Sequence, residues 1–235
     1  MARRIQQASL PKTLPDLEGW EIAPHYRPAR EVGGDFYDVL ELEDGQFGLV
    51  VGDATGKGVP AALVMATTCG MLRAAANSSN SPGEVLERVN EALSARIPPS
   101  MFVTCFYAIL EPESATLRYA NAGHDPPYVH RSGDYAEELR ARGMPLGLMA
   151  GMEYEEEEIS LGGGENVLFY SDGLVEAHDP IGQMFGFPRL RALVAEHGEE
   201  GSLGDFLMEE LYSFVGEGWE QEDDITLLTL QRSTP

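Results

Sequence analysis

The stretch EVGGDFYDVLELEDGQFGLVVGDATGKG, residues 31–58, decides the fold around it. Two strand-like runs, residues 35–42 and 47–53, flank the turn residues Glu43-Asp44-Gly45. Antiparallel strands joined by a short turn bring their far ends together. We therefore predict a hairpin that places Asp35 beside Asp53, so that the two carboxylates can share one ion.

Two further aspartates lie in similar acidic phrases farther along the chain, Asp172 in FYSDGLVEA and Asp223 in QEDDITLL. Each phrase borders an apolar run, so a compact fold would place these carboxylates at strand ends, where unpaired negative charge is costly. Hard divalent ions prefer oxygen ligands, and no Cys or His adjoins these aspartates. The pattern predicts a Mg²⁺ or Mn²⁺ site rather than a zinc site. The alternative is that each aspartate only caps a turn.

The rest of the chain alternates groups of strands with helices. One helix, residues 81–97, opens with Ser81 as N-cap, Pro82 in the first position and Glu84 in the third, which is a capping-box arrangement. The pattern predicts further helices at residues 59–77 and 203–215, and strands at residues 20–26, 101–112, 115–123, 126–131, 165–173 (ending at Asp172) and 223–232. This order predicts an α+β fold whose sheets are covered by helices.

Composition excludes several classes of protein. The chain has 235 residues, 43% of them hydrophobic, which is enough for a substantial core, and its formal charge of -23 opposes binding to nucleic acid. No apolar stretch approaches a membrane span and the start lacks the apolar core of a secretory signal, so we expect a cytoplasmic protein with no membrane partner. Cys69 and Cys105 read as buried free thiols, and the run EYEEEEIS, residues 153–160, reads as a solvated strand edge.

Five phrases in order, EVGGDFYDV, VVGDATGKGVPAALVMA, NAGHDPP, FYSDGLVEA and EDDITLL, resemble the SpoIIE/RsbU-like branch of the metal-dependent protein phosphatases, relatives of protein phosphatase 2C. The resemblance implies a four-layer α-β-β-α sandwich of two mainly antiparallel sheets flanked by helices. It implies a coupling segment at residues 1–15 and a single phosphatase domain at residues 16–235. It also implies hydrolysis of phosphoserine or phosphothreonine on a protein, typically a STAS-type anti-sigma-factor antagonist, with two Mn²⁺ or Mg²⁺ ions.

The resemblance also assigns candidate ligands. Asp35 matches the first metal aspartate, Asp53 the bridging one, and Ala54 the position whose backbone carbonyl binds metal. Asp172 and Asp223 match the third and fourth carboxylates, and the neighbouring Asp224 is the less favoured ligand. Two ions about 3.5–4 Å apart can acidify a shared water for direct in-line attack on phosphorus.

Four further positions, Arg30, Thr55, His124 and Asp38, are interpreted in relation to the candidate site. Arg30 matches a place where the wider superfamily can put a phosphate-binding arginine, or it is a solvated loop arginine. Protein phosphatase 2C enzymes carry a histidine, proposed as general acid, two residues after the bridging aspartate, where this chain has Thr55; the acid is then a metal-bound water or is absent. We interpret His124 as a loop histidine hydrogen-bonded to backbone. Asp38 faces away from Asp35 along the strand and is expected to be structural.

Two other functions compete with this interpretation. GDATGKG lacks the spacing of a nucleotide-binding loop, because Lys57 is followed by glycine rather than Ser or Thr. A non-catalytic or weakly active phosphoprotein-binding module of the same fold is the alternative to an enzyme. The resemblance further suggests an upstream sensor domain acting through residues 1–15 and a helix-mediated homodimer. Because the helices within residues 60–97 directly follow the Asp53 loop and could move that ligand, we predict that they act as a switch.

Overall fold

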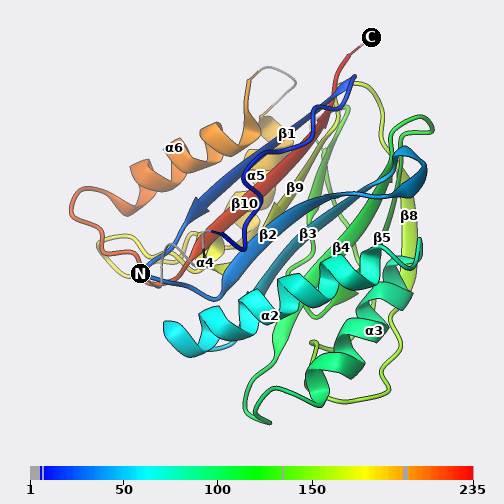
Figure 1. The fold of residues 1–235 in the computed structure, drawn as a ribbon. Coiled ribbons are helices and arrows are strands. Elements are labelled where there is room, and N and C mark those ends of the chain that lie inside the picture. The colour runs from blue at the N-terminus through cyan, green and yellow to red at the C-terminus, as the bar shows by residue number, and fades with distance from the viewer. Residues whose placement is uncertain (1–5, 7, 134, 198–200, 235) are drawn as a thin grey trace. The chain divides into compact units, whose positions relative to one another are not determined.

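The computed structural model describes residues 6, 8–133, 135–197 and 201–234. Contacts between residues divide the chain into two compact units. The first comprises Arg30–His124 and Arg140–Leu161 with the described part of Met1–Pro15; the second comprises Asp16–Ala29, Asp125–Leu139 and Gly162–Pro235. Each unit holds one antiparallel five-stranded sheet with helices against it (Figure 1), so the predicted α+β class is confirmed.

The sheet of the first unit contains the predicted hairpin. Its strand order is β2 (Asp35–Glu41), β3 (Phe47–Ala54), β4 (Val103–Glu111), β5 (Thr116–Ala122) and β8 (Glu156–Ser160). A single 3₁₀ turn, η1 (Glu43–Gly45), joins β2 to β3, and Asp44 there adopts a positive φ of 56°. Positive φ is tolerated best by Gly, Asn and Asp, which explains the turn residues at this point. The hairpin prediction is confirmed.

Helices α2 (Val59–Ala76) and α3 (Pro82–Ser94) pack against each other and against this sheet, α2 on β2 and β3, and α3 on β4 and β5 (Figure 1). The Ser81 cap is confirmed, because its hydroxyl accepts a hydrogen bond of 3.1 Å from the Glu84 N–H. The reciprocal half of the capping box is different. Glu84 binds the Ser79 hydroxyl, and that hydroxyl accepts the Ser81 N–H at 3.2 Å.

Helix α2 is apolar on most of its circumference. Its 18 residues have a length and composition that would also suit a membrane span, so the expectation that no apolar stretch approaches such a length was wrong. Core helices share these properties, and 44% of the residues in α2 are buried. Met65, Cys69 and Leu72 are among the buried side chains, which give the helix its place in the core of the first unit.

The sheet of the second unit has the order β1 (Trp20–Arg27), β10 (Ile225–Arg232), β9 (Asn166–Tyr170), β6 (Tyr128–Arg131) and β7 (Tyr135–Glu138). Helix α5 (Phe187–Glu196) packs on β6 and β7, and α6 (Leu203–Val215) packs on β1, β9 and β10. The predicted strand at residues 165–173 was wrong at its end. It stops at Tyr170, and Asp172 instead begins the short helix α4 (Asp172–Val175).

The cysteines, the acidic run and the N-terminal segment also have defined places in the structure. Cys69 and Cys105 are free and buried as expected, and burial raises the pKa of the Cys69 thiol to about 12. The acidic run forms β8, an exposed strand at the sheet edge, as expected. Residues 1–5 and 7 of the predicted coupling segment, residues 1–15, lie outside the described residues, and Gln6 and Leu10 are buried within the first unit.

Candidate metal centre

Asp35 and Asp53 lie opposite each other in the register of β2 and β3. Directly opposed residues project from the same face of an antiparallel pair, with their β-carbons about 4.5–5.5 Å apart. Asp35 is buried, with 2% of its surface exposed, and Asp53 is half-buried. Two carboxylates are thereby held close together where water is scarce.

The loop before β2 closes onto this pair. The Ala54 N–H donates to the Gly34 carbonyl at 3.2 Å. A β-carbon on Gly34 would lie 2.6 Å from Asp53 Oδ1 and 2.4 Å from the Ala54 carbonyl oxygen. Only glycine allows this approach, so the glycine of GGDFYD brings the two predicted ligand atoms, a carboxylate and a carbonyl oxygen, against the same loop.

A third strand extends the polar row. Asp53 is opposite Thr104 of β4, and the Thr104 hydroxyl lies 2.9 Å from Nδ1 of His124. The His124 ring thus contacts a side-chain hydroxyl, a partner that the interpretation of His124 as a histidine bonded to backbone did not include. The His124 backbone is held by Asn121, which accepts the His124 N–H at 2.8 Å and donates to its carbonyl at 2.9 Å.

Thr55 occupies the position of the histidine in protein phosphatase 2C enzymes. Its hydroxyl donates to the Phe102 carbonyl at 2.9 Å and accepts the Phe102 N–H at 2.9 Å. Both hydrogen-bonding roles are therefore used to fasten the loop after β3 to the start of β4. The expectation that the general acid is a metal-bound water, or is absent, stays a prediction.

Asp172 and Asp223 lie in the second unit. Burial, followed by repulsion from Glu176, Asp223 and Asp125, raises the pKa of the Asp172 carboxyl from 3.8 to about 6. Such crowding of carboxylates raises the free energy of the charged state unless a cation is present. Sequence reasoning missed Asp125 and Glu176 as members of this cluster, although Asp125 lies in the phrase NAGHDPP and Glu176 in the phrase FYSDGLVEA.

Asp224 is a structural neighbour of Asp223. Its Oδ1 accepts the Ala29 N–H at 2.8 Å, and the residue is 5% exposed. Its carbonyl lies against Gly173, where a β-carbon would come within 2.0 Å. The Asp223 carboxylate also has a backbone partner, because its Oδ1 accepts the Asp224 N–H at 2.9 Å, so the preference for Asp223 as the ligand stays a prediction.

Asp38 is buried, whereas Arg30 is exposed to solvent. Asp38 is 4% exposed and receives a 2.7 Å hydrogen bond from Arg73 Nε on α2, as expected for a structural residue. Arg73 also donates to the Ser9 carbonyl at 2.7 Å, a partnership that the sequence did not reveal. Arg30 is exposed on the loop before β2, which is compatible with either of its two readings.

The donor chemistry of these residues fits hard divalent cations, because it consists of carboxylate and carbonyl oxygens at partly or fully buried positions. Asp35 and Asp53 belong to the first unit and Asp172 and Asp223 to the second. Within the described parts of the chain, no group of three or more His, Cys, Asp or Glu side chains is gathered as an ion site. The four-aspartate ligand set therefore stays a prediction.

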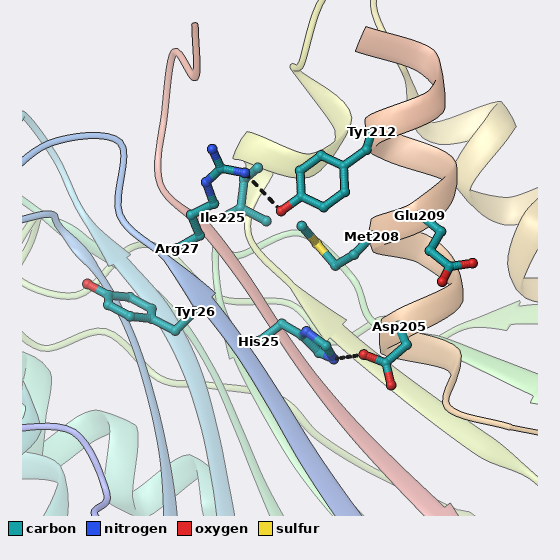
Figure 2. Close-up of a pocket in the computed structure, with 8 residues that line it drawn as sticks. All are labelled: His25, Tyr26, Arg27, Asp205, Met208, Glu209, Tyr212 and Ile225. Atoms are coloured by element: carbon teal, nitrogen blue, oxygen red, sulfur yellow. Dashed lines mark hydrogen bonds and ion pairs between the residues drawn. The ribbon is translucent and has the colours of Figure 1, made fainter. Parts of the chain in front are cut away.

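A separate groove of about 600 Å³ lies in the second unit between β1 and α6 (Figure 2). The His25 ring faces Asp205, at 3.5 Å, and Arg27 donates to the Tyr212 hydroxyl at 2.8 Å. The side chains of His25 and Arg27 thus each have a partner inside the groove. Its lining is His25, Tyr26, Arg27, Asp205, Met208, Glu209, Tyr212 and Ile225, which includes none of the predicted ligands.

Comparison with known proteins gives a consistent set of similarities. The family model for Stage II sporulation protein E (SpoIIE) matches residues 43–233, a range that begins after Asp35. The chain is 30% identical to Protein IcfG of Synechocystis sp., over 98% of this chain and 41% of IcfG. It is 28% identical to Phosphoserine phosphatase RsbU of Bacillus subtilis, over 99% of this chain and 69% of RsbU.

A solved structure resembles the fold closely. The RsbU and RsbW domains of Rv1364c from Mycobacterium tuberculosis align with a TM-score of 0.81 and 30% identity, covering 97% of this chain and 64% of that one. The chain therefore spans only part of the longer proteins that it matches, between about two fifths and two thirds of their lengths.

Proposed function

Because the chain belongs to the SpoIIE family of protein phosphatase 2C-like phosphatases, we propose that it is a metal-dependent hydrolase of phosphoserine or phosphothreonine on a protein. The observation that carries the proposal is the opposition of Asp35 and Asp53 on neighbouring strands. The similarity to a phosphoserine phosphatase, RsbU, supports the same reaction class. We further propose a phosphorylated STAS-type anti-sigma-factor antagonist as substrate, in the cytoplasm.

In this proposal Asp35, Asp53, Asp172, Asp223 and the Ala54 carbonyl hold a pair of Mn²⁺ or Mg²⁺ ions. Such ions, when bound, supply an acidified water and neutralise the charge of the phosphoryl oxygens. The chain's own part is to present the carboxylates in fixed positions. The Gly34 loop and the β2–β3 register do this for Asp53 and Asp35, so little reorganisation is needed as the site fills.

Two roles follow from the surroundings of the site. The Thr55 hydroxyl is committed to Phe102, so we assign protonation of the leaving seryl oxygen to solvent rather than to this side chain. Arg30 is an exposed guanidinium on the loop leading to Asp35, where it can meet a phosphate dianion from solvent. We propose that Arg30 helps to bind the substrate phosphate, in which case Arg30→Ala raises KM more than it lowers kcat.

A regulatory part of the proposal concerns residues 1–15. The Gln6 side chain donates to the Gly33 carbonyl at 2.6 Å and accepts the Gly33 N–H at 3.2 Å, and Arg73 joins α2 to the Ser9 carbonyl. The segment thus touches both the loop before Asp35 and the first of the two helices expected to act as a switch. We propose that an upstream sensor domain, and dimerisation through helices, act on the site by this route.

The test compares turnover with binding. Phosphate release from p-nitrophenyl phosphate and from a phosphorylated STAS-domain protein is measured across a Mn²⁺ titration, for wild type, Asp53→Asn and Asp172→Asn. Asp44→Asn is the matched control, because Asp44 is an exposed turn residue and Asn tolerates its positive φ. We expect loss of at least about 10²-fold in both site variants and none in the control.

The alternative, a phosphoprotein-binding module, predicts a different result. Wild type would then bind the phosphorylated STAS-domain protein in calorimetry but release no phosphate at any Mn²⁺ concentration. Asp53→Asn would bind it equally well. Turnover by wild type that requires Mn²⁺ excludes this alternative.

A further inference from the structure

A row of polar side chains crosses three strands of the first unit. Asp35 of β2 is opposite Asp53 of β3, and Asp53 is opposite Thr104 of β4. Because opposed residues share a face of the sheet, the Thr104 hydroxyl projects to the same side as the two carboxylates and is the cross-strand neighbour of Asp53. A hydroxyl at this place can donate one hydrogen bond and accept two.

The position of that hydroxyl is set by a buried histidine. His124 is 7% exposed and its Nδ1 lies 2.9 Å from the Thr104 hydroxyl. The loop that carries His124 is held by its two hydrogen bonds to the Asn121 side chain. Gly123 in this loop has a φ of 68°, and an added β-carbon would lie 2.8 Å from the Pro145 ring, so any other residue would be strained there. The imidazole is therefore a fixed partner rather than a mobile loop side chain.

We infer that Thr104 and His124 form a positioning pair that orients the Asp53 carboxylate for metal binding, an inference that rests on the proposed function. When the His124 Nδ1–H donates to the Thr104 oxygen, the hydroxyl proton is directed away from the ring and is available to a carboxylate on the same face. Hydrogen bonds of this kind fix the orientation of ligands at metal sites, and their loss typically weakens metal binding about 10–100-fold. Neither residue is a metal ligand in this role.

The experiment measures Mn²⁺ binding by isothermal titration calorimetry, without substrate, together with the melting temperature in EDTA. Thr104→Val removes only the hydroxyl, and Thr104→Ser keeps it. His124→Ala removes the ring that fixes the hydroxyl, and the double variant Thr104→Val/His124→Ala combines the two losses. Thr116→Val, on β5 of the same sheet, is the control for a lost threonine hydroxyl away from the row.

We expect the dissociation constant for Mn²⁺ to rise about tenfold or more in Thr104→Val and in His124→Ala. The double variant should be no worse than Thr104→Val, because both changes remove the same orienting contact. Thr104→Ser and Thr116→Val should bind within about threefold of wild type. If Thr104 had only a packing role, Thr104→Ser would weaken Mn²⁺ binding, because serine lacks the packing methyl group. Wild-type binding in Thr104→Ser therefore distinguishes a positioning role from a packing role.

Two results overturn the inference: wild-type Mn²⁺ affinity in Thr104→Val, or equal weakening in Thr104→Ser and Thr104→Val. If Thr104→Val does not fold, His124→Ala and Thr104→Ser decide, and unchanged binding in His124→Ala overturns the inference. Failure of the proposed function looks different, because wild type and Asp53→Asn would then both take up no Mn²⁺. The positioning pair alone is contradicted if wild type binds Mn²⁺ strongly, Asp53→Asn loses that binding and Thr104→Val keeps it. The proposed function would then stand.

Discussion

Gly34 lies so close to Asp53 that a β-carbon on the glycine would come within 2.6 Å of the carboxylate oxygen Oδ1. The same atom would lie 2.4 Å from the Ala54 carbonyl oxygen. Contacts this short force either the loop or the strand end to move. A place where the chain cannot accept a methyl group without moving is therefore also the place where two predicted ligand atoms meet.

Gly34→Ala is expected to lower the free energy of unfolding by about 1–3 kcal/mol, because the added methyl group overpacks the loop. It should also weaken Mn²⁺ binding. Urea unfolding in EDTA and calorimetry with Mn²⁺ check the two effects. Gly70→Ala is the matched control, since Gly70 lies within α2 with open space around its β-carbon position, and alanine there should stabilise by about 0.5–1 kcal/mol. Equal stability of the Gly34→Ala variant and wild type would contradict the close approach.

Asp172→Asn is expected to stabilise the metal-free protein. Burial and neighbouring carboxylates raise the pKa of Asp172 to about 6, above its ordinary 3.8. A raised pKa gives stability that is complete below about pH 4 and is lost as the pH rises through about 6. At pH 7.5 in EDTA the variant should therefore exceed wild type by about 1–2 kcal/mol, after allowance for partial solvent access.

The measurement is urea unfolding in EDTA at pH 5 and pH 7.5. The advantage of Asp172→Asn should shrink at pH 5, where the wild-type carboxyl is largely protonated. Asp16→Asn, at an exposed position, makes the same change in net charge and controls for it. A metal-free Asp172→Asn variant that is less stable than wild type at pH 7.5 would show that the carboxylate is not crowded.

Arg73→Met is expected to cost about 2–4 kcal/mol, because it leaves the buried Asp38 carboxylate without its cation. Burial raises the pKa of Asp38 even with Arg73 present, so protonation at pH 5 should reduce the loss. The double variant Asp38→Asn/Arg73→Met should be more stable than Arg73→Met alone. Chemical unfolding of Asp38→Asn, Arg73→Met and the double variant measures this cycle.

The matched control for that cycle is Arg88→Met. Arg88 forms an exposed ion pair with Glu84 at 3.3 Å, one helical turn away, and such pairs contribute less than about 0.5 kcal/mol. If Arg73→Met and Arg88→Met cost the same, the Asp38 pair contributes no more than a surface contact.

Gln6→Leu tests the attachment of the N-terminal segment. It removes both hydrogen bonds to the Gly33 backbone and leaves those buried groups without a side-chain partner, at a cost of about 1–3 kcal/mol. If the segment acts on the site, the Mn²⁺ concentration for half-maximal phosphatase activity should change as well. Gln183→Leu, at an exposed loop position, is the control. A loss of stability with an unchanged Mn²⁺ dependence would leave Gln6 a structural role only.

Local pattern was sufficient for the parts of the fold that local interactions determine. The hairpin around Glu43–Gly45 follows from turn chemistry, and the bounds of α6 follow from the spacing of its apolar residues. The end of the strand before Asp172 could not be predicted, because an apolar run alone does not distinguish a strand residue from the first residue of a short helix. The Ser171 hydroxyl accepts the Thr226 N–H, a contact with a residue far along the chain that helps to fix this point.

The candidate site was predictable only in part for the same reason. The pairing of Asp35 with Asp53 is local to one hairpin and could be derived from it. The contacts of Thr104 with His124, and of Arg73 with Ser9 and Asp38, join separate elements and have no signature in the spacing of residues. The sequence therefore predicted the candidate carboxylates, but not the contacts that Thr104, His124 and Arg73 make between separate elements.

The exposed glutamates of β8 have a consequence for how the protein behaves in concentrated solution. This strand ends its sheet, so one side of its backbone has no neighbouring strand in that sheet, and Glu156, Glu157 and Glu158 follow one another along it. Like charges on two such borders repel, which discourages copies from joining into ribbons. Surface engineering that exchanges these glutamates for neutral residues would thus invite polymerisation, even if the folded molecule itself were unharmed.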